Sequence, residues 1–259
     1  MAAELKSATQ GRTMVLTISN PEMRNALGPE IYAAGVEALN VADSNPEVRS
    51  VVITGEGSTF CAGGNLQRLL ANRAQPREVQ AQSIDGLHGW IEAIRTFPKP
   101  VIAAVEGAAA GAGFSLALAC DFLVAAEDAV FVMAYSSVGL SPDGGGSWSL
   151  VQALPRQAVN ELLMFGERIG PLRLQQFGMV NRVSAPGGAL QDALALAERL
   201  NERAPNAIAS IKELVNDAAV APLDRHLASE REHFVRNLYH ANGGIGIQAF
   251  LARQKPEYP

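Results

Sequence analysis

Two short glycine-rich stretches contain the residues whose types and spacing could do chemistry. They are residues 60–66 (FCAGGNL) and residues 107–114 (GAAAGAGF). Glycine leaves main-chain N–H groups open to a ligand, because no Cβ atom stands in the way. Two such turns facing each other would offer a pair of backbone donors to an oxygen that gains negative charge. The sequence therefore predicts chemistry on a carbonyl group, which requires neither a metal nor a nucleotide redox cofactor.

Each glycine stretch follows an apolar run that is typical of a buried strand. These runs are residues 50–54 and 101–105, and the second stretch continues into a predicted buried helix at 114–119. Other strands are predicted over 13–18, 122–124 and 130–133, and helices over 29–42 and 83–96. Strands alternate with helices as far as about residue 183, so we predict an α/β fold with a largely parallel sheet.

The character of the chain changes at the Pro-Gly-Gly break of residues 186–188. Beyond it, strand signals stop and three helices are predicted, over 190–204, 206–219 and 223–239. We therefore predict a core domain over residues 1–186 and a C-terminal helical region over 187–259, which could serve subunit packing. Residues 66–82 are polar and rich in Arg and Gln, so we expect a mobile surface segment there.

The composition excludes several classes of function. The 259 residues are 48% hydrophobic and 18% charged, as in ordinary globular proteins. The net charge of -5 argues against a nucleic-acid partner, which needs a basic surface. Cys61 and Cys120 form neither a disulfide framework nor a metal cluster, so we expect a cytoplasmic setting. No run is long and apolar enough to cross a bilayer, so no membrane partner is expected.

Several motifs, in order, resemble those of the crotonase superfamily, the enoyl-CoA hydratase/isomerase group. Residues 20–27 (NPEMRNAL) look like its N-terminal acyl-CoA motif, 60–66 like its first oxyanion loop and 99–121 like its signature segment. The similarity covers nearly the whole chain. It implies a spiral of repeated β-β-α units and a C-terminal trimerisation region, hence a homotrimer or a hexamer built from two trimers. It also implies an acyl-CoA thioester substrate, with coenzyme A as part of the substrate and no permanently bound cofactor.

The resemblance places the two oxyanion donors at the N–H groups of Gly64 and Ala112. Ala112 lies near a predicted helix N-terminus, where the helix dipole adds to the hydrogen bond. Together the two amides would hold the thioester oxygen as an enolate or a tetrahedral oxyanion forms. In other enzymes, removing one such donor costs about 2.7–4 kcal/mol of barrier. The alternative is that both stretches are only tight strand–helix turns.

The residues facing these loops depart from the hydratase pattern. Hydratases of the family place two glutamates over the substrate double bond, and the corresponding positions here are Ser115 and Tyr135. Neither can act as a carboxylate base at neutral pH. Asp143 stands where several isomerases of the family have a carboxylate that moves a proton between substrate carbons. Since Pro-Asp-Gly is also a turn signal, Asp143 is alternatively a turn or N-cap residue.

A third pattern resembles the family's 4-chlorobenzoyl-CoA dehalogenase. That enzyme has an aspartate nucleophile at the position of Asp143, an activating histidine aligned with His88 and a tryptophan aligned with Tyr135. An Asp nucleophile and a His base could hydrolyse an aryl ester intermediate. The alternative for His88 is a helix residue packed at the domain face. Dehalogenation, hydration by a non-standard arrangement and a non-catalytic binding protein therefore remain alternatives to isomerisation.

The remaining candidates concern coenzyme A. The residues that the family motifs place along the acyl-CoA site are Ala26, Ala62 and Leu66. The basic residues that could meet coenzyme A phosphates are Arg24, Arg253 and Lys255, the last two from a neighbouring subunit. Their alternative is ordinary solvated charge.

Overall fold

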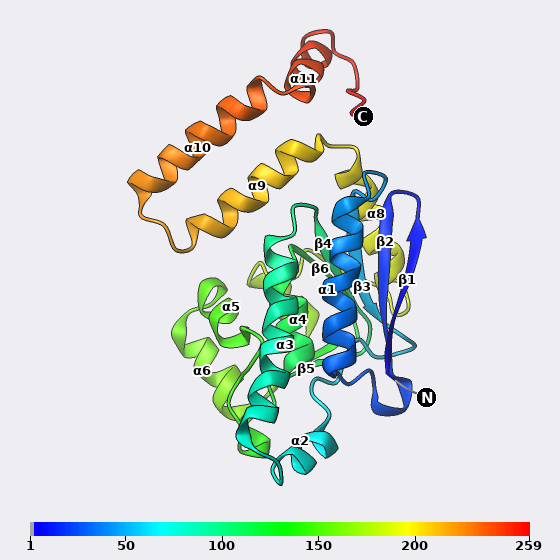
Figure 1. Cartoon of the computed structure of the whole chain (residues 1–259), viewed down its shortest axis with the longest axis vertical. Helices are drawn as coiled ribbons and strands as arrows, with labels where there is room; N and C mark the ends of the chain where they lie inside the picture. The colour runs from blue at the N-terminus through cyan, green and yellow to red at the C-terminus, as the bar shows by residue number, and fades with distance from the viewer. Residues whose placement is uncertain (1–2) are drawn as a thin grey trace.

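The structure is a computed structural model, and it describes residues 3–259 (Figure 1). Its strands are β1 Glu4–Gln10, β2 Thr13–Ser19, β3 Ser50–Gly55, β4 Val101–Val105, β5 Ala108–Ala110, β6 Phe122–Ala126, β7 Val130–Val132, β8 Arg168–Ile169 and β9 Arg182–Ser184. Its α-helices are α1 Pro29–Ser44, α2 Leu66–Asn72, α3 Arg77–Thr96, α4 Ala112–Ala119, α5 Gly146–Ala153, α6 Arg156–Phe165, α7 Pro171–Gln176, α8 Ala189–Asn201, α9 Pro205–Ala218, α10 Leu223–Leu238 and α11 Ala241–Leu251. Two short 3-10 helices are η1 Pro21–Met23 and η2 Ser136–Val138.

The larger sheet has six strands in the order β1-β2-β3-β4-β6-β9. Strands β1 and β2 form an antiparallel hairpin, and every other neighbouring pair is parallel. Helices α1 and α3 pack together on one side of the sheet, while α8 contacts β2, β3, β4, β6 and β9 from the other (Figure 1). The predicted largely parallel α/β arrangement is confirmed.

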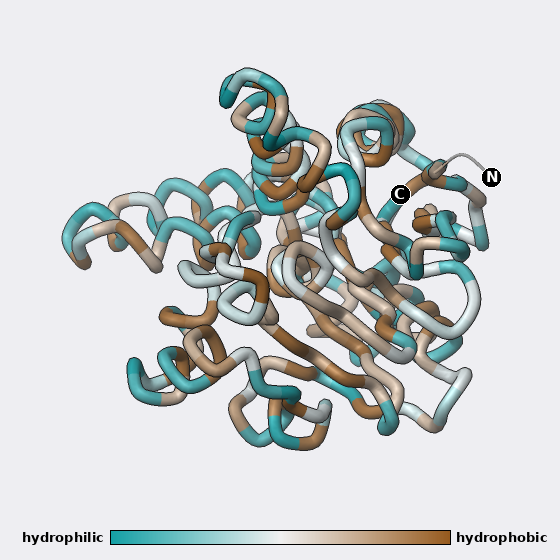
Figure 2. The backbone as a smooth tube through the Cα atoms, turned by 90° about the horizontal axis from the view of Figure 1, so that it is seen from below, coloured by the Kyte–Doolittle hydropathy of each residue, from teal (hydrophilic) through white to brown (hydrophobic). Residues whose placement is uncertain are grey.

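Side chains of the central strands alternate between two hydrophobic cores, as the period of a strand requires. On β3, Val51 and Ile53 belong to the larger core, whereas Val52 faces α8. Figure 2 shows hydrophobic residues concentrated in the central strands and hydrophilic residues on the outer helices. The smaller core contains Val15, Val52, Ile102, Ala104, Val124, Ala189, Ala193 and Ala197.

A second sheet, in the order β5-β7-β8, continues from the first. The chain passes from β4 to β5 at Gly107, whose φ is +55° and whose added Cβ would lie 2.1 Å from the Ser58 carbonyl oxygen. Only glycine fits such a close approach at positive φ. Strand β6 likewise leads from the larger sheet into β7 of the second sheet. Two isolated bridges lie along the second layer and join Cys61 to Ala109 and Leu27 to Gly64. The chain thus repeats strand–strand–helix units.

The last helices separate into two groups. Helix α8 is part of the packed body, whereas α10 and α11 lie away from the sheets at the top of Figure 1. The predicted division at residue 187 stays a prediction: it marks the change to all-helical structure, but α8 covers one face of the larger sheet. None of the helices within residues 3–259 has the length and apolar run needed to cross a membrane.

Residues 66–82 lie at the surface, as expected, and α2 and the first turns of α3 occupy most of them. The predicted mobility of this segment stays a prediction. Asn65 caps α2 by accepting the Arg68 N–H at 3.0 Å. The other strands and α-helices for which no range was predicted are β1, β5, β8, β9, α5, α6, α7 and α11. Among them, β1 is almost entirely exposed and polar, and α11 contains several glycines, so neither carries the usual sequence signal.

Candidate active site

The two glycine stretches lie against each other. Cys61 in the first stretch donates its N–H to the Ala108 carbonyl at 3.0 Å and accepts the Ala110 N–H at 2.9 Å. A Cβ atom added to Gly113 would lie only 2.5 Å from the Cys61 carbonyl oxygen. Position 113 therefore requires glycine, because the first glycine stretch lies too close for any larger residue. The structure brings together the two loops that the sequence predicted would face each other.

The amides of Gly64 and Ala112 are both free of intramolecular hydrogen bonds within residues 3–259. Leu27 donates to the Gly63 carbonyl at 2.7 Å and pairs with Gly64 in a parallel bridge. In a parallel bridge of this kind, the backbone of Leu27 bonds to the neighbours of Gly64 and not to Gly64 itself. The Gly64 N–H therefore points away from Leu27. Ala112 is the first residue of α4, and such N–H groups have no intrahelical acceptor.

These two amides belong to adjacent segments. A Cβ atom added to Gly63, whose φ is +87°, would lie 3.3 Å from the Ala112 nitrogen. The main chain just before Gly64 therefore touches the start of α4. Two unbonded N–H groups on adjoining backbone, one at a helix N-terminus, can stabilise an oxygen that gains negative charge.

Asp143 lies half-buried on the loop between η2 and α5. Its Oδ1 atom accepts the Tyr135 hydroxyl at 2.7 Å. The Tyr135 ring also covers Gly111, the N-cap residue of α4: a Cβ added to Gly111 would lie 3.5 Å from Tyr135 Cζ. Tyr135 therefore links the carboxylate to the segment that presents Ala112.

The Tyr135 hydroxyl is a donor at physiological pH. Burial raises the pKa of Tyr135 above its usual value, and the Asp143 carboxylate raises that pKa further. The phenol therefore stays protonated and gives its hydrogen to Asp143. The sequence analysis placed Tyr135 and Asp143 in one site pattern, but it did not indicate the hydrogen bond between them.

Two residues near this site were not singled out from the sequence. Tyr32 of α1 is 6% exposed, and burial raises its pKa to about 12; the negative charge of Asp143 adds to the rise and Arg68 opposes it. Arg68 of α2 contacts the Leu27 carbonyl oxygen at 3.5 Å and the Glu30 carboxylate at 3.8 Å. Both face the site only because α1 and α2 are helices, and α2 was not predicted.

A cavity of about 340 Å³ lies beside the first glycine stretch. It is lined by Ala3, Asn20, Met23, Ala26, Leu27, Gly28, Glu30, Asn65 and Arg68. Of the candidates for coenzyme A contacts, Ala26 lines this cavity and Leu66 is an exposed residue directly after Asn65. The exposed Arg24 accepts the Ala62 N–H at 3.0 Å through its carbonyl oxygen. The structure thus brings these four candidates to one region.

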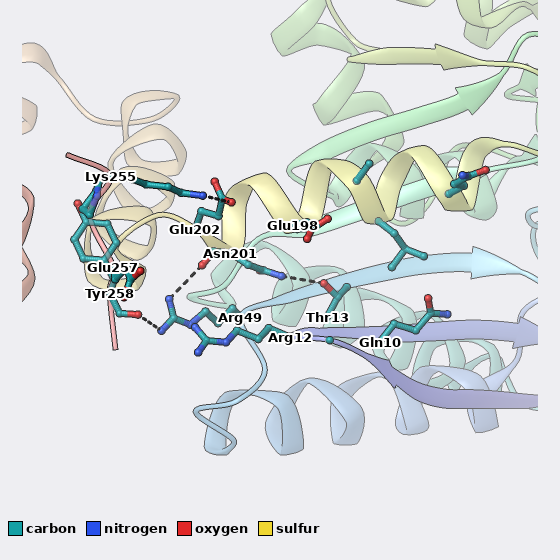
Figure 3. Close-up of a pocket in the computed structure, with 15 residues that line it drawn as sticks. Gln10, Arg12, Thr13, Arg49, Glu198, Asn201, Glu202, Lys255, Glu257 and Tyr258 are labelled. Atoms are coloured by element: carbon teal, nitrogen blue, oxygen red, sulfur yellow. Dashed lines mark hydrogen bonds and ion pairs between the residues drawn. The ribbon is translucent and has the colours of Figure 1, made fainter. Parts of the chain in front are cut away.

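Lys255 lies elsewhere in the chain. It forms an ion pair with Glu202 at 2.6 Å and lines a second cavity of about 860 Å³ (Figure 3). This cavity shares no lining residue with the first. In Figure 1 the C-terminal segment lies at the opposite end of the molecule from α2. Within one chain, Lys255 is therefore separated from the other candidates.

The larger cavity lies between α8, the β1–β2 turn and the C-terminal segment (Figure 3). Arg49 holds that segment in place by donating to the Tyr258 carbonyl at 3.0 Å and to the Asn201 carbonyl at 3.2 Å. The cavity walls combine Arg12 and Arg49 with glutamates, so they carry no dominant charge. We assign the candidate site to the glycine loops, where the unbonded amides and the carboxylate meet.

The His88 side chain makes no hydrogen bond or ion pair with any residue in 3–259. It is exposed on α3, whereas the preceding Leu87 packs toward the Asp143 loop, 3.4 Å from where a Gly144 Cβ would stand. The Asp–His pairing that the dehalogenase resemblance suggests stays a prediction without a supporting contact.

Two sheets wound from strand–strand–helix units, with two glycine loops that meet in the second layer, define the crotonase fold. A model of the enoyl-CoA hydratase/isomerase family matches residues 8–259. The chain is similar in structure to an enoyl-CoA hydratase from Polaromonas sp. JS666, with a TM-score of 0.98, 68% identity and coverage of 99% of this chain and 100% of that one. The protein belongs to the enoyl-CoA hydratase/isomerase family.

Two curated relatives show the range of reactions in proteins similar to this chain. The 1,2-epoxyphenylacetyl-CoA isomerase of Escherichia coli (strain K12) is 32% identical over 95% of this chain and 94% of its own length. The carnitinyl-CoA dehydratase of Salmonella heidelberg (strain SL476) is 34% identical over 99% of this chain and 98% of its own length. These matches support an acyl-CoA enzyme and confirm the family that the motifs predicted.

Proposed function

We propose that the protein moves a proton within an unsaturated acyl-CoA, shifting its double bond through a thioester enolate, with Asp143 as the base. The carrying observation is the hydrogen bond of 2.7 Å from Tyr135 to Asp143, which fixes one carboxylate beside the glycine loops. The other oxygen, Oδ2, has no hydrogen-bond partner among the described residues. It is the atom that would take the substrate proton.

The proposed reaction on a 3-enoyl-CoA has two steps. The Asp143 carboxylate removes a proton from the carbon next to the thioester, and the electron pair of that C–H bond forms the enolate, whose oxygen is bound by the Gly64 and Ala112 amides. The protonated Asp143 then returns the proton to the fourth carbon, and the double bond moves to the position next to the thioester. One carboxylate suffices because the proton leaves and returns through the same group.

The comparisons support this choice at the level of reaction class. One relative carries the name of an isomerase, and the proposed chemistry is also an isomerisation. Hydration is a second candidate, because the similar Polaromonas structure is named an enoyl-CoA hydratase. With Ser115 and Tyr135 at the glutamate positions of the hydratases, a single carboxylate would have to activate the water and protonate the substrate.

We also propose that coenzyme A enters as part of the substrate along the cavity beside the first glycine stretch. Arg68 lines that cavity, and the exposed Arg24 lies on the segment next to it, so both offer positive charge to the phosphates. Ala26 and Ala62 present small side chains beside the same segment, which leaves room for the ligand. Lys255 would reach this region only from another subunit.

The test is the Asp143→Asn variant, assayed with 3-enoyl-CoA, 2-enoyl-CoA and 4-chlorobenzoyl-CoA by thioester absorbance and halide release. We expect isomerisation to be the fastest wild-type reaction and to fall about a thousandfold in the variant. Asp85→Asn, which removes an exposed carboxylate on α3, is the matched control and should keep full activity. Full isomerase activity in Asp143→Asn would refute the proposed base. Hydration as the dominant wild-type reaction would favour the second candidate.

A further inference from the structure

Ser115 lies at the centre of the candidate site, yet no step of the proposed reaction uses it. Its side chain is completely buried in the first turns of α4. Its Oγ donates to the main-chain carbonyl of Asp143 at 2.9 Å. The same carbonyl accepts the Gly146 N–H at 3.2 Å. Two donors therefore hold the backbone of the residue that we propose as the base.

Two of the three glycines after Asp143 are shaped to this contact. Gly144 has a φ of +58°, and a Cβ there would lie 3.1 Å from the Ser115 Cβ. A Cβ on Gly146 would lie 2.5 Å from the Ser115 Oγ and 2.9 Å from the Met133 Cε. The loop thus passes directly over Ser115, and only a small side chain at 115 together with glycine at 144 and 146 allows it.

Asp143 is consequently held at two points. Ser115 fixes its main chain and Tyr135 fixes its Oδ1 atom, which leaves Oδ2 as the free oxygen. Both holding residues contact the segment that presents the Ala112 amide: Ser115 bonds through its N–H to the Gly111 carbonyl at 3.0 Å, and the Tyr135 ring covers Gly111. Base and oxyanion donor are therefore built on one rigid unit.

We infer that Ser115 is a positioning residue that sets the place of Asp143 relative to the oxyanion amides, and that its small size is what lets the 144–146 loop pass over it. This inference rests on the proposed function, because it assigns Ser115 a role through the proposed base. A carboxylate side chain at 115 would need the space that the 144–146 loop occupies. In this chain, a glutamate at 115 would therefore displace the loop that holds Asp143.

The test compares Ser115→Ala, Ser115→Cys and Ser115→Glu, with Ser147→Ala as a control that removes an exposed hydroxyl on α5. Loss of one neutral hydrogen bond predicts that kcat for 3-enoyl-CoA isomerisation falls about tenfold in Ser115→Ala, while KM changes by less than about twofold. Ser115→Cys, a near-isosteric and weaker donor, should lie between wild type and Ser115→Ala. If Ser115→Ala fails to fold, the kcat of Ser115→Cys alone tests the positioning role. An unchanged kcat in both variants would overturn the inference.

Two further arms separate this inference from the proposed function. In the Asp143→Asn background, Ser115→Ala should reduce the residual rate no further, because it acts through Asp143; an equal loss in both backgrounds would overturn the positioning role. Full activity of Asp143→Asn would instead refute the proposed function itself.

Ser115→Glu should lose isomerisation without gaining hydration of 2-enoyl-CoA. A variant that gained hydration and kept isomerisation would show that the two carboxylates can coexist.

Discussion

At the scale of single residues, the site is organised around the hydroxyl of Tyr135. Its hydrogen bond to Asp143 and its position over Gly111 connect the acid–base group to the start of α4. Burial and the nearby carboxylate raise the pKa of Tyr135, so this hydroxyl keeps its proton well above neutral pH. A neutral phenol can orient the carboxylate without competing with it for the substrate proton.

Tyr135→Phe should lower kcat about tenfold and leave KM nearly unchanged, since it removes one hydrogen bond to a charged group but keeps the ring that covers Gly111. Steady-state kinetics on 3-enoyl-CoA measure both constants. Tyr239→Phe is the control, because Tyr239 is 84% exposed on the segment after α10. A large rise in KM with unchanged kcat would contradict the orienting role.

At the scale of elements, the fold supplies two things that separate loops could not: contact between the glycine stretches and a fixed start for α4. The β4–β5 and β6–β7 crossings carry the chain from one sheet to the other, and the loops meet in the second layer. The positions of the two amides therefore depend on packing between backbones rather than on any side chain.

Gly113→Ala should separate the two glycine stretches, because its Cβ would lie 2.5 Å from the Cys61 carbonyl and 2.7 Å from the Cys61 Cβ. We expect loss of most activity and of about 2 kcal/mol in the free energy of unfolding. Gly89→Ala on α3 is the matched control: its Cβ meets nothing within 4 Å and alanine favours a helix, so that variant should be as stable as wild type or more stable. Urea unfolding and isomerase assays compare the two. Wild-type activity in Gly113→Ala would contradict the assigned loop contact.

Helix α9 is attached to the body of the protein through Lys212. Its ammonium lies 2.7 Å from the Asp121 carboxylate and donates to the carbonyls of Ile94 at 2.8 Å and Lys99 at 3.3 Å. The side chains of Lys212 and Asp121 are 9% and 21% exposed. Removing the cation would leave a largely buried carboxylate and two carbonyls without this partner.

Lys212→Met should therefore lower the free energy of unfolding at neutral pH by about 2 kcal/mol, whereas Lys6→Met, whose ion pair is exposed, should cost much less. Burial raises the pKa of Asp121 and Lys212 opposes that rise, so the pKa climbs further in the variant. A carboxyl group whose pKa is raised in the folded state lowers the free energy of unfolding as the pH rises through that pKa. The deficit measured by urea unfolding should thus be larger at neutral pH than at about pH 4. An equal deficit at both would refute the role of Asp121.

At the scale of the whole molecule, the projecting helices present apolar side chains to solvent. Phe234 on α10 is 70% exposed, and Phe250 and Leu251 on α11 are 83% and 76% exposed. Large apolar residues gathered on helices away from the body are typical of surfaces that bury against another chain. They support our proposal of a homotrimer or hexamer, in which Lys255 would lie near a neighbouring subunit.

Phe250→Glu should weaken this assembly, because a carboxylate would be placed in an apolar interface. Light scattering coupled to size-exclusion chromatography should show a trimer or hexamer for wild type and smaller species for the variant. Asn40→Glu, an equal change of charge at an exposed position on α1, should keep the wild-type mass. A monomeric wild type would refute the proposed assembly.

The elements predicted correctly are those with a continuous apolar run or with apolar residues at helical spacing. Residues 50–54 and 101–105 are buried on both faces, so their continuous apolar runs indicated strands, and the structure confirms both. Three of the missed elements share one cause. Polar α2, exposed β1 and glycine-containing α11 are stabilised by a cap, by an adjacent strand and by neighbouring helices, none of which leaves a local hydrophobic pattern.

The sequence by itself determined the α/β fold, the family and the two glycine stretches, because glycine content, apolar runs and motif order are local properties of the chain. Only the tertiary structure decided how the candidates combine. It paired Tyr135 with Asp143, placed Ser115 beneath the Asp143 loop, and separated Lys255 from Ala26 within one chain. Such pairings join residues from different elements, and the crossings between two sheets, rather than spacing along the chain, set which of them meet.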